Sequence, residues 1–474
     1  MLNTFTFFLL LLLLVMLTIR TYRFSSKKKV VVSGDGNVQG ESEASLIKTN
    51  RMKDWLYTGI VLCSVGLLVC VYIFLKGSMY EPLMMEWLNI IVRLMHITFG
   101  IAWIGASFYF VFLENALNRT ENVRDELAGN LWAVHGGGFY YLEKYKVAPK
   151  EIPKHLHWFK YEAYFTWLTG FSLLFVVYYF HAQTFLVDKS VMDLSSLAAI
   201  SIGIGSLIVG WIIYDLLCKT PLVKKGVWFA LIGFIIATAF AWFYTQVFSG
   251  RAAYIHFGAM LGTIMAFNVF FIIIPSQKAM VRAAKLGKPL DPELGKKAGL
   301  RSLHNNYFTM PVLFVMISNH FPSTFGNAQS WLVLAILSLG VAGVKHWLNL
   351  REKGQYNVWV LPVSVLIILA AAYLTAPVKK TTACKSEITF SQVNAIVQSR
   401  CIQCHSANPT DSIFIKAPNG VMYDTPDEIV KYKDKILQRA VLTESMPLAN
   451  LTHMTKEERE VLRCWIEQGA KVGK

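Results

Sequence analysis

The sequence predicts an all-α protein, in which a polytopic transmembrane helical bundle is followed by a small all-α domain. Three observations predict this class. Charged residues make up only 16% of the 474 residues and hydrophobic residues 54%, whereas an ordinary soluble domain is about 25% charged. Apolar stretches long enough to cross a bilayer recur as far as residue 376. The polar segment after them holds four of the seven cysteines.

Ten apolar stretches are predicted to span the membrane, since a span needs roughly 20 apolar residues. The first has no positively charged start and no small-residue cleavage site, so we interpret it as an uncleaved anchor rather than a signal peptide. The first and the eighth are short. The ten stretches are 5–19, 55–75, 88–112, 162–182, 196–218, 227–247, 253–275, 306–320, 331–349 and 357–376.

These stretches divide the chain into three predicted domains. Residues 1–78 form an extension with two extra spans, joined by a polar Gly/Ser-rich linker at 30–50. Residues 79–378 form a membrane domain with eight core spans, and residues 379–474 form the small C-terminal domain. Cys63 and Cys70 lie in an apolar stretch and are expected to be core or lipid-facing residues.

The distribution of Lys and Arg predicts the orientation of the spans. The loops on one side (20–54, 113–161, 219–226, 276–302 and 350–356) hold 27 of them, and the loops on the other side hold 3. Cytoplasmic loops carry this excess, so ten spans that begin outside also end outside. The C-terminal domain is therefore predicted to lie in the periplasm, beside a bacterial inner membrane. The loop 276–302 is expected to contain an amphipathic helix along the cytoplasmic surface.

The net charge of +16 could suggest binding to nucleic acid. The positive charges lie in the loops between apolar stretches, and no basic helix carries interleaved aromatic residues. We therefore interpret the charge as setting the topology, and expect the lipid bilayer, not nucleic acid, as the partner.

The C-terminal domain contains Cys401-Ile-Gln-Cys404-His405, and C-x-x-C-H is the attachment signature of c-type haem. The two thiols would form thioethers to the porphyrin, and the adjacent histidine would be the proximal ligand of the iron. A redox dithiol or half of a zinc site is the alternative. No second Cys/His pair with zinc spacing follows, and a dithiol does not require the histidine.

A sixth iron ligand is expected, and His/Met ligation is the arrangement of cytochromes c. Met422, Met446 and Met454 lie downstream of the motif. We favour Met446 over Met422, because Pro447 stiffens the loop that would bring it to the iron.

Two helices are predicted around the motif. Apolar residues at helical spacing precede it from Phe390 to Arg400, and a threonine cap opens a final helix within 455–470. Cys384 and Cys464 could form a disulfide in an oxidising compartment. The sequence alone does not show whether their Cα atoms lie close enough.

Ionisable residues inside the spans are candidates for function, because they are costly in a membrane. Arg93 and His96 lie one turn inside a span, His256 lies near the end of another, and Asn319 and His320 end a third. The orientation places all of them in the leaflet next to the C-terminal domain. His96 shares a helix face with Gly100, Trp103 and Ser107, and this face should turn inward. It could ligate a b-type haem, bind substrate or form an interhelical hydrogen bond.

Four segments resemble the membrane-bound bacterial urate hydroxylases, a family in which an eight-span membrane domain precedes a cytochrome c domain. The resemblance covers about 79–474, and the two spans before it depart from the family pattern. The segments are MYEPLMMEWLNIIVRLMHITFGIAWIGASFYFVFLENALNR (79–119), LWAVHGGGFYYLEKYKVAP (131–149), LHWFKYEAYFTWLTGF (156–171) and RSLHNNYFTMPVLFVMISNHFP (301–322).

The resemblance implies oxidation of urate to 5-hydroxyisourate with water as the oxygen source. Electrons would leave through the c-type haem, held by Cys401, Cys404, His405 and Met446, to a soluble cytochrome or a terminal oxidase. Independently of the family, Arg93 could hold the urate anion. A histidine such as His96 or His320 could act as general base toward water, and His256 is a further catalytic candidate.

Urate oxidation removes two electrons, while one haem iron accepts one. Either two haem turnovers occur per substrate or a second redox centre, such as a b-type haem at His96, lies in the membrane domain. Two other classes stay open: a quinol-oxidising electron-transfer protein, and a transporter or sensor with the cytochrome as redox reporter.

Overall fold

The computed structural model describes residue 78 and residues 80–149, 151–153, 155–376, 384, 386–411, 413–414 and 416–472. The chain divides into two compact units, residues 1–88 and 89–474. The predicted spans at 5–19 and 55–75, the linker at 30–50, and Cys63 and Cys70 lie outside the described residues.

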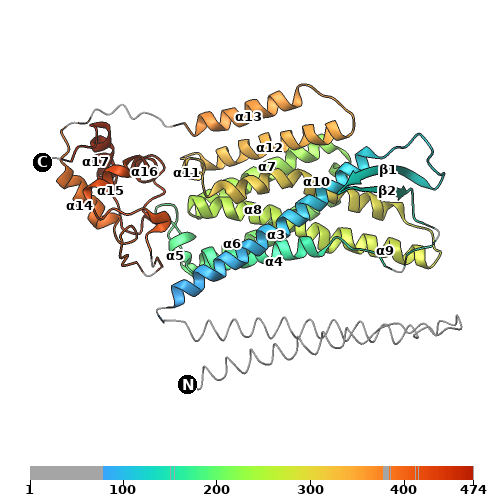
Figure 1. Cartoon of the computed structure of the whole chain (residues 1–474), viewed down its shortest axis with the longest axis horizontal. Coiled ribbons are helices and arrows are strands. Elements are labelled where there is room, and N and C mark those ends of the chain that lie inside the picture. The colour runs from blue at the N-terminus through green and yellow to red at the C-terminus, as the bar shows by residue number, and fades with distance from the viewer. Residues whose placement is uncertain are drawn as a thin grey trace, which may run out of the picture. The chain divides into compact units, whose positions relative to one another are not determined.

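Most of the described chain is helical, which confirms the predominance of α-structure (Figure 1). The symbol η marks 3-10 and π segments. Up to residue 374 the elements are α3 (Glu81–Ala116), β1 (Leu127–His135), β2 (Gly138–Tyr145), α4 (Tyr161–Leu173), η1 (Leu174–Tyr179), α5 (Ala182–Phe185), α6 (Ser196–Lys219), η2 (Pro221–Lys224), α7 (Gly226–Val247), α8 (Gly250–Phe267), η3 (Asn268–Ile273), α9 (Ile274–Lys285), α10 (Pro292–Ser318), α11 (Pro322–Phe325), α12 (Ser330–Glu352) and α13 (Val360–Leu374).

Five helical stretches among the described residues are long and apolar enough to cross a membrane: Glu81–Ala116, Ser196–Lys219, Gly226–Val247, Gly250–Lys285 and Ser330–Glu352. Three further predicted spans also fall on helices. These are α4 with η1, the second half of α10, and the shorter apolar helix α13. The helical conformation of these stretches is confirmed, while the number of spans stays a prediction.

Helix α8 is the centre of this bundle. Its residues are buried on most sides, and it packs against α6, α7 and α10. Ser249 caps its first turn, because the hydroxyl accepts a hydrogen bond from the N–H of Ala252 at 3.4 Å. α12 then packs on α7, α10 and α13 (Figure 1). Polar groups on α8, α10 and α12 are therefore held within a rigid core.

The long loop predicted at 113–161 contains a two-stranded antiparallel hairpin, which the all-α prediction missed. Strands β1 and β2 pair from Leu127 with Tyr145 to His135 with Gly138. The turn between them is Gly136-Gly137, with φ of 57° and 80°. A two-residue turn with both φ values positive favours glycine, so the glycine run after His135 serves the turn.

The tail contains α14 (Phe390–Arg400), η4 (Pro418–Gly420), α15 (Pro426–Lys431), α16 (Lys433–Ile436), η5 (Leu437–Leu442), η6 (Leu448–Asn450) and α17 (Lys456–Glu467). The predicted helices at 390–400 and within 455–470 are confirmed. Helices α14, α15 and α17 each begin with a threonine capping box, formed by Thr389, Thr425 and Thr455 with the residue three positions later.

The tail has a hydrophobic core of its own, to which α14 and α17 contribute Val393, Val397, Leu462 and Trp465. Cys384 and Cys464 form a disulfide, with an S–S distance of 2.17 Å and a Cα–Cα distance of 5.7 Å. The pairing that the sequence left open is thus made. It fastens the start of the tail to its last helix.

Candidate functional site

The cysteine–histidine motif forms a tight turn directly after α14. The N–H groups of Cys404 and His405 both donate to the carbonyl of Cys401, at 3.3 and 3.0 Å. This geometry continues the helix by one turn, so that the three side chains follow each other around a single loop. Both thiols are free and half-buried.

The imidazole of His405 is oriented by the backbone. Its Nδ1 lies 2.9 Å from the carbonyl oxygen of Val421, and a carbonyl only accepts, so Nδ1 carries the proton. Nε2 is then the nitrogen with the lone pair. Burial lowers the pKa of His405, and the nearby charge of Arg439 adds to this effect. A neutral imidazole with a fixed tautomer suits a metal ligand.

The two thiols do not have the character of a reactive dithiol. Burial raises the pKa of Cys401 to about 12 and that of Cys404 to about 11. Reactive cysteines instead have pKa values lowered by positive charge or a helix N-terminus. Among the described residues, no group of three or more Cys, His, Asp and Glu side chains gathers as a metal site would require. Two half-buried thiols with raised pKa values are thus not poised for dithiol exchange.

The three downstream methionines lie in different environments. Met454 is 3% exposed and packs in the core of the tail. Met446 and Met422 are each half-buried. Both backbone polar groups of Met446 are hydrogen-bonded. Its N–H donates to the Arg439 carbonyl at 3.0 Å, and its carbonyl accepts from the Arg459 guanidinium at 2.8 Å. This leaves Met446 the better-anchored of the two candidates for a sixth ligand.

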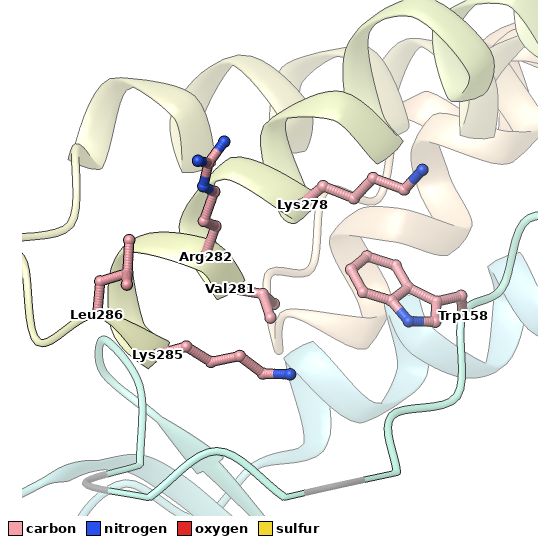
Figure 2. Close-up of a pocket in the computed structure, with 6 residues that line it drawn as sticks. All are labelled: Trp158, Lys278, Val281, Arg282, Lys285 and Leu286. Atoms are coloured by element: carbon pink, nitrogen blue, oxygen red, sulfur yellow. The ribbon is translucent and has the colours of Figure 1, made fainter. Parts of the chain in front are cut away.

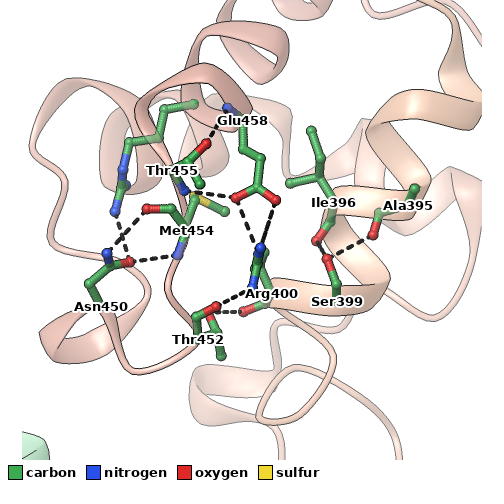
Figure 3. A network of polar contacts seen from close by, with 10 residues as sticks. Ala395, Ile396, Ser399, Arg400, Asn450, Thr452, Met454, Thr455 and Glu458 are labelled. Carbon is green, nitrogen blue, oxygen red and sulfur yellow. Dashed lines mark hydrogen bonds and ion pairs between the residues drawn. The ribbon is translucent and has the colours of Figure 1, made fainter.

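A polar network fastens the segment before α17 to the end of α14 (Figure 3). Arg400 binds the carboxylate of Glu458, with Nη2 2.9 Å from Oε1, and also donates to the carbonyl of Thr452. The Thr452 hydroxyl donates back to the Arg400 carbonyl at 3.1 Å. Because Arg400 directly precedes Cys401, this network fixes the position at which the motif begins.

Arg93 and His96, predicted from the sequence, lie on the same stretch of α3 but face different partners. Arg93 is exposed, and its guanidinium donates to the side chain of Asn89 at 3.1 Å. His96 faces inward, as predicted, along with Gly100. Its Nδ1 lies 3.0 Å from the carbonyl of Thr166 on α4, so Nδ1 is protonated and Nε2 is the nitrogen available as base or ligand.

His256 is fully buried on α8, and both of its ring nitrogens are engaged. Nδ1 donates to the carbonyl of Ala252 at 2.8 Å, and Nε2 accepts from the hydroxyl of Tyr179 at 3.0 Å. A Cβ on Gly203 would lie 2.9 Å from Nε2, so the helices pack directly against the ring. This histidine is held as a structural hydrogen-bonding group, and no lone pair remains free for a substrate.

His320 is exposed just after α10, while its neighbour Asn319 reaches Tyr178. The Asn319 amide lies 3.5 Å from the Tyr178 hydroxyl, and its Oδ1 is buried without a partner among the described residues. Tyr178 also contacts His256, with ring centroids 6.3 Å apart. The structure thus joins His256 to Asn319 through Tyr178, but it does not bring His320 or Arg93 into that contact.

The sequence did not indicate Tyr178 and Tyr179. Both lie in the π segment η1, and π segments inside helices occur often at functional sites. The only local signal was a pair of tyrosines in an apolar stretch.

A second polar cluster lies around Arg301 on α10. Arg301 is 2% exposed and pairs with Asp215 of α6 at 2.6 Å. Asn268 accepts from Arg301 and donates to Asn305 at 2.8 Å. Tyr214 bonds His304 Nδ1 at 2.8 Å. No fully buried side-chain nitrogen or oxygen of this cluster lacks a hydrogen-bond partner within the described residues.

A surface pocket of about 430 Å³ lies beside α9 (Figure 2). Three basic residues on one face of α9 line the pocket, namely Lys278, Arg282 and Lys285. Trp158, Val281 and Leu286 complete its lining. The pocket is cationic and open, and it lies within the loop 276–302 expected to follow the cytoplasmic surface. Most of that loop's first half is indeed helix, as α9, and its last part belongs to α10.

The fold and these clusters define a predominantly helical protein whose long apolar helices could cross a membrane. Residues 82–376 match the family described as urate oxidase N-terminal. Because the match covers more than half of the chain, this protein belongs to the urate oxidase N-terminal family, which marks it as a urate-related enzyme. No curated protein and no solved structure matches the chain.

Proposed function

We propose that this protein oxidises urate at a bacterial inner membrane and passes the electrons to a c-type haem in its C-terminal tail. The proposal rests on the presence of two features in the same chain. One is the family match over 82–376, which supports urate as substrate. The other is the turn at Cys401–His405, with two free thiols and an oriented imidazole.

The reaction balances with water as the oxygen source. Urate and one water molecule give 5-hydroxyisourate, two protons and two electrons. The hydroxyl oxygen comes from water, so a base must take up a proton from it. His96 supports this role through Nε2, because Nδ1 is already bonded to Thr166. His320 is the alternative base. His256 is a weaker candidate, since Tyr179 occupies its second nitrogen.

Cys401, Cys404, His405 and Met446 would hold the haem. When bound, the haem supplies a one-electron acceptor whose potential is raised by His/Met ligation. The Val421 carbonyl orients His405 for this role, and the Arg400–Glu458 network fixes the start of the motif. A soluble cytochrome or a terminal oxidase would take the electrons onward.

Two one-electron steps per urate, or a second redox centre, are needed to match the two electrons. A b-type haem at His96 is the second centre that the sequence left open. Only Nε2 of His96 could serve as ligand, and the ring packs so closely on Gly170 that a Cβ there would lie 2.8 Å from Cε1. A haem-to-protein ratio by absorbance distinguishes one haem from two.

The decisive experiment adds urate anaerobically to purified, air-oxidised holoenzyme and records the absorption spectrum. Reduction of the c-type haem together with formation of 5-hydroxyisourate is the expected result. If urate leaves the haem oxidised while a quinol reduces it, the protein is a quinol-linked electron carrier and the urate proposal fails. Uptake of urate without haem reduction would instead indicate a transporter or sensor.

A further inference from the structure

Lys345 is a buried cation that forms no direct ion pair with any residue that the structure describes. It lies on α12 and is 2% exposed. Its Nζ lies 3.9 Å from the centroid of the Phe108 ring. The carboxylate that acts on it electrostatically, Glu352, lies two turns further along α12 and accepts from the Asn115 amide at 3.3 Å. A buried charge is costly unless it is paired and hydrogen-bonded. A single cation–π contact replaces only part of the lost hydration.

One turn further along α12, the Asn349 amide pairs with the amide of Asn306 on α10, and each amide keeps one atom without a hydrogen bond among the described residues. The Nδ2 of Asn349 donates to Oδ1 of Asn306 at 2.8 Å. The remaining amide atoms, Nδ2 of Asn306 and Oδ1 of Asn349, are buried without partners among the described residues. If both amides were rotated by half a turn, one donor and one acceptor would again be left over.

These groups face the same region. Asn349 follows Lys345 by one helical turn, so the two side chains lie on one face of α12. Asn306 of α10 reaches that face through its bond to Asn349. Ser338 lies two turns before Lys345 on the same helix, and its buried hydroxyl also lacks a partner within the described chain.

The neighbouring Arg301 cluster shows that buried polar groups in this bundle can be fully partnered. Arg301 has Asp215 and Asn268, and Asn305 bonds both Asn268 and the Met265 carbonyl. Asn305 and Asn306 are adjacent in sequence, yet only Asn306 keeps an unused donor. Native proteins leave few buried polar atoms unpaired, so each such atom calls for an explanation.

We infer that Lys345, Asn306 and Asn349 form a binding site for a small planar anion that carries an N–H group next to a C=O group. The C=O would accept from Asn306, the N–H would donate to Asn349, and the negative charge would offset that of Lys345. Urate is such an anion, and this assignment rests on the proposed function. Arg93, which the sequence suggested for this role, is exposed and already bonded to Asn89.

The inference concerns binding rather than electron transfer. Lys345 lies 15 residues from the first residue of α12, which is about 22 Å along the helix axis. It also lies close to the Lys/Arg-rich loop 350–356, so the site would be reached from the cytoplasmic side. The site would therefore hold urate on entry, before it reaches His96, where the proposed function places the reaction.

The test uses the full-length holoenzyme in lipid nanodiscs, with urate binding and steady-state KM as measurements. Lys345→Met removes the charge but keeps the length of the side chain. It should raise Kd and KM for urate by roughly 10- to 100-fold, because a hydrogen bond to a charged group is lost. The haem content and its reduction by dithionite should not change. Lys353→Met, at an exposed lysine just after α12, is the matched control and should leave KM unchanged.

A second variant guards against a simple folding defect. Asn349→Asp would place a carboxylate one turn from Lys345, so it should weaken urate binding by charge repulsion, while its melting temperature and haem content report whether the variant folds. A panel of N-methylated urates adds a chemical control. The methyl group that removes the N–H facing Asn349 should abolish binding to the wild type.

The outcomes separate the two proposals. If urate reduces wild-type haem but Lys345→Met and Asn349→Asp bind urate normally, the site assignment is wrong and the proposed function stands. If urate neither binds the wild type nor reduces its haem, the proposed function itself fails.

Discussion

Arg400 and Glu458 meet across 58 residues of chain, with the guanidinium 2.9 Å from the carboxylate. Glu458 also closes the capping box of α17, since its carboxylate accepts from the Thr455 N–H at 2.8 Å. One side chain therefore joins the start of the last helix to the residue before Cys401.

This carboxylate should make the stability of the tail depend on pH. Burial alone would raise the pKa of Glu458, but the hydrogen bonds from Arg400 and Thr455 and the charges of Arg400 and Arg459 outweigh it and lower the pKa. A lowered folded-state pKa stabilises the fold above the ordinary value of about 4.3. That contribution is lost as the pH falls toward the folded-state pKa.

Thermal unfolding of the wild type and Glu458→Gln, followed by haem absorbance, checks this. The variant should be less stable at pH 7, and the difference should shrink below pH 4. Asp434→Asn, at an exposed carboxylate of the same domain, is the control. A difference that is constant with pH would rule out the ionic contribution.

His405→Ala should leave a haem that is covalently attached but lacks its proximal ligand. The thioethers depend on Cys401 and Cys404, whereas the iron coordination depends on Nε2 of His405. Haem staining on a denaturing gel should persist, and the spectrum should change to that of a haem without its histidine. His453→Ala, at an exposed histidine in the same tail, should keep the wild-type spectrum. An unchanged spectrum in His405→Ala would contradict the ligand assignment.

Met446→Leu and Met454→Leu should separate ligation from packing. Loss of Met446 should lower the reduction potential of the haem, because Met ligation raises it. Met454 is a core residue, so its replacement by leucine should cost less than about 1.5 kcal/mol and leave the potential unchanged. Redox titration and chemical denaturation provide the two measurements. A potential shift in Met422→Leu instead would identify Met422 as the ligand.

The disulfide between Cys384 and Cys464 should stabilise the tail through its loop. Its cysteines are 80 residues apart, for which the loop-entropy model gives roughly 4 kcal/mol. The double serine variant should lose a large part of this in denaturant unfolding. Dithiothreitol should destabilise the wild type and have no effect on the variant. Equal sensitivity of both proteins to dithiothreitol would show that the stabilisation has another source.

The sequence predicts well what depends on neighbours along the chain. The periodicity from Phe390 to Arg400 gives α14, and Thr455 with Glu458 marks the start of α17. The inward face of His96 and Gly100 follows from the same spacing. The hairpin was not predicted, although glycines at a hairpin turn are a recognised signal.

What the sequence does not predict depends on partners distant in the chain. The buried guanidinium of Arg301 finds its partners in Asp215 and Asn268, which lie on two other elements. That Asn306 Nδ2 and Asn349 Oδ1 have no partner among the described residues is likewise visible only once α10 and α12 are packed. His256 was a catalytic candidate because it is an ionisable residue near the end of a predicted span, and only the contact with Tyr179 shows that its second nitrogen is taken.

The bond from Cys384 to Cys464 turns nearly the whole tail into a covalent ring that contains the cysteine–histidine turn. A protease that cut this ring once, at an exposed loop such as that around Asn419, would release no fragment. Both pieces would stay attached to the helices that precede the tail. Such a nick would be invisible on a non-reducing gel and would appear only after reduction, so the chain would keep the segment that holds Cys401, Cys404 and His405 despite a broken backbone.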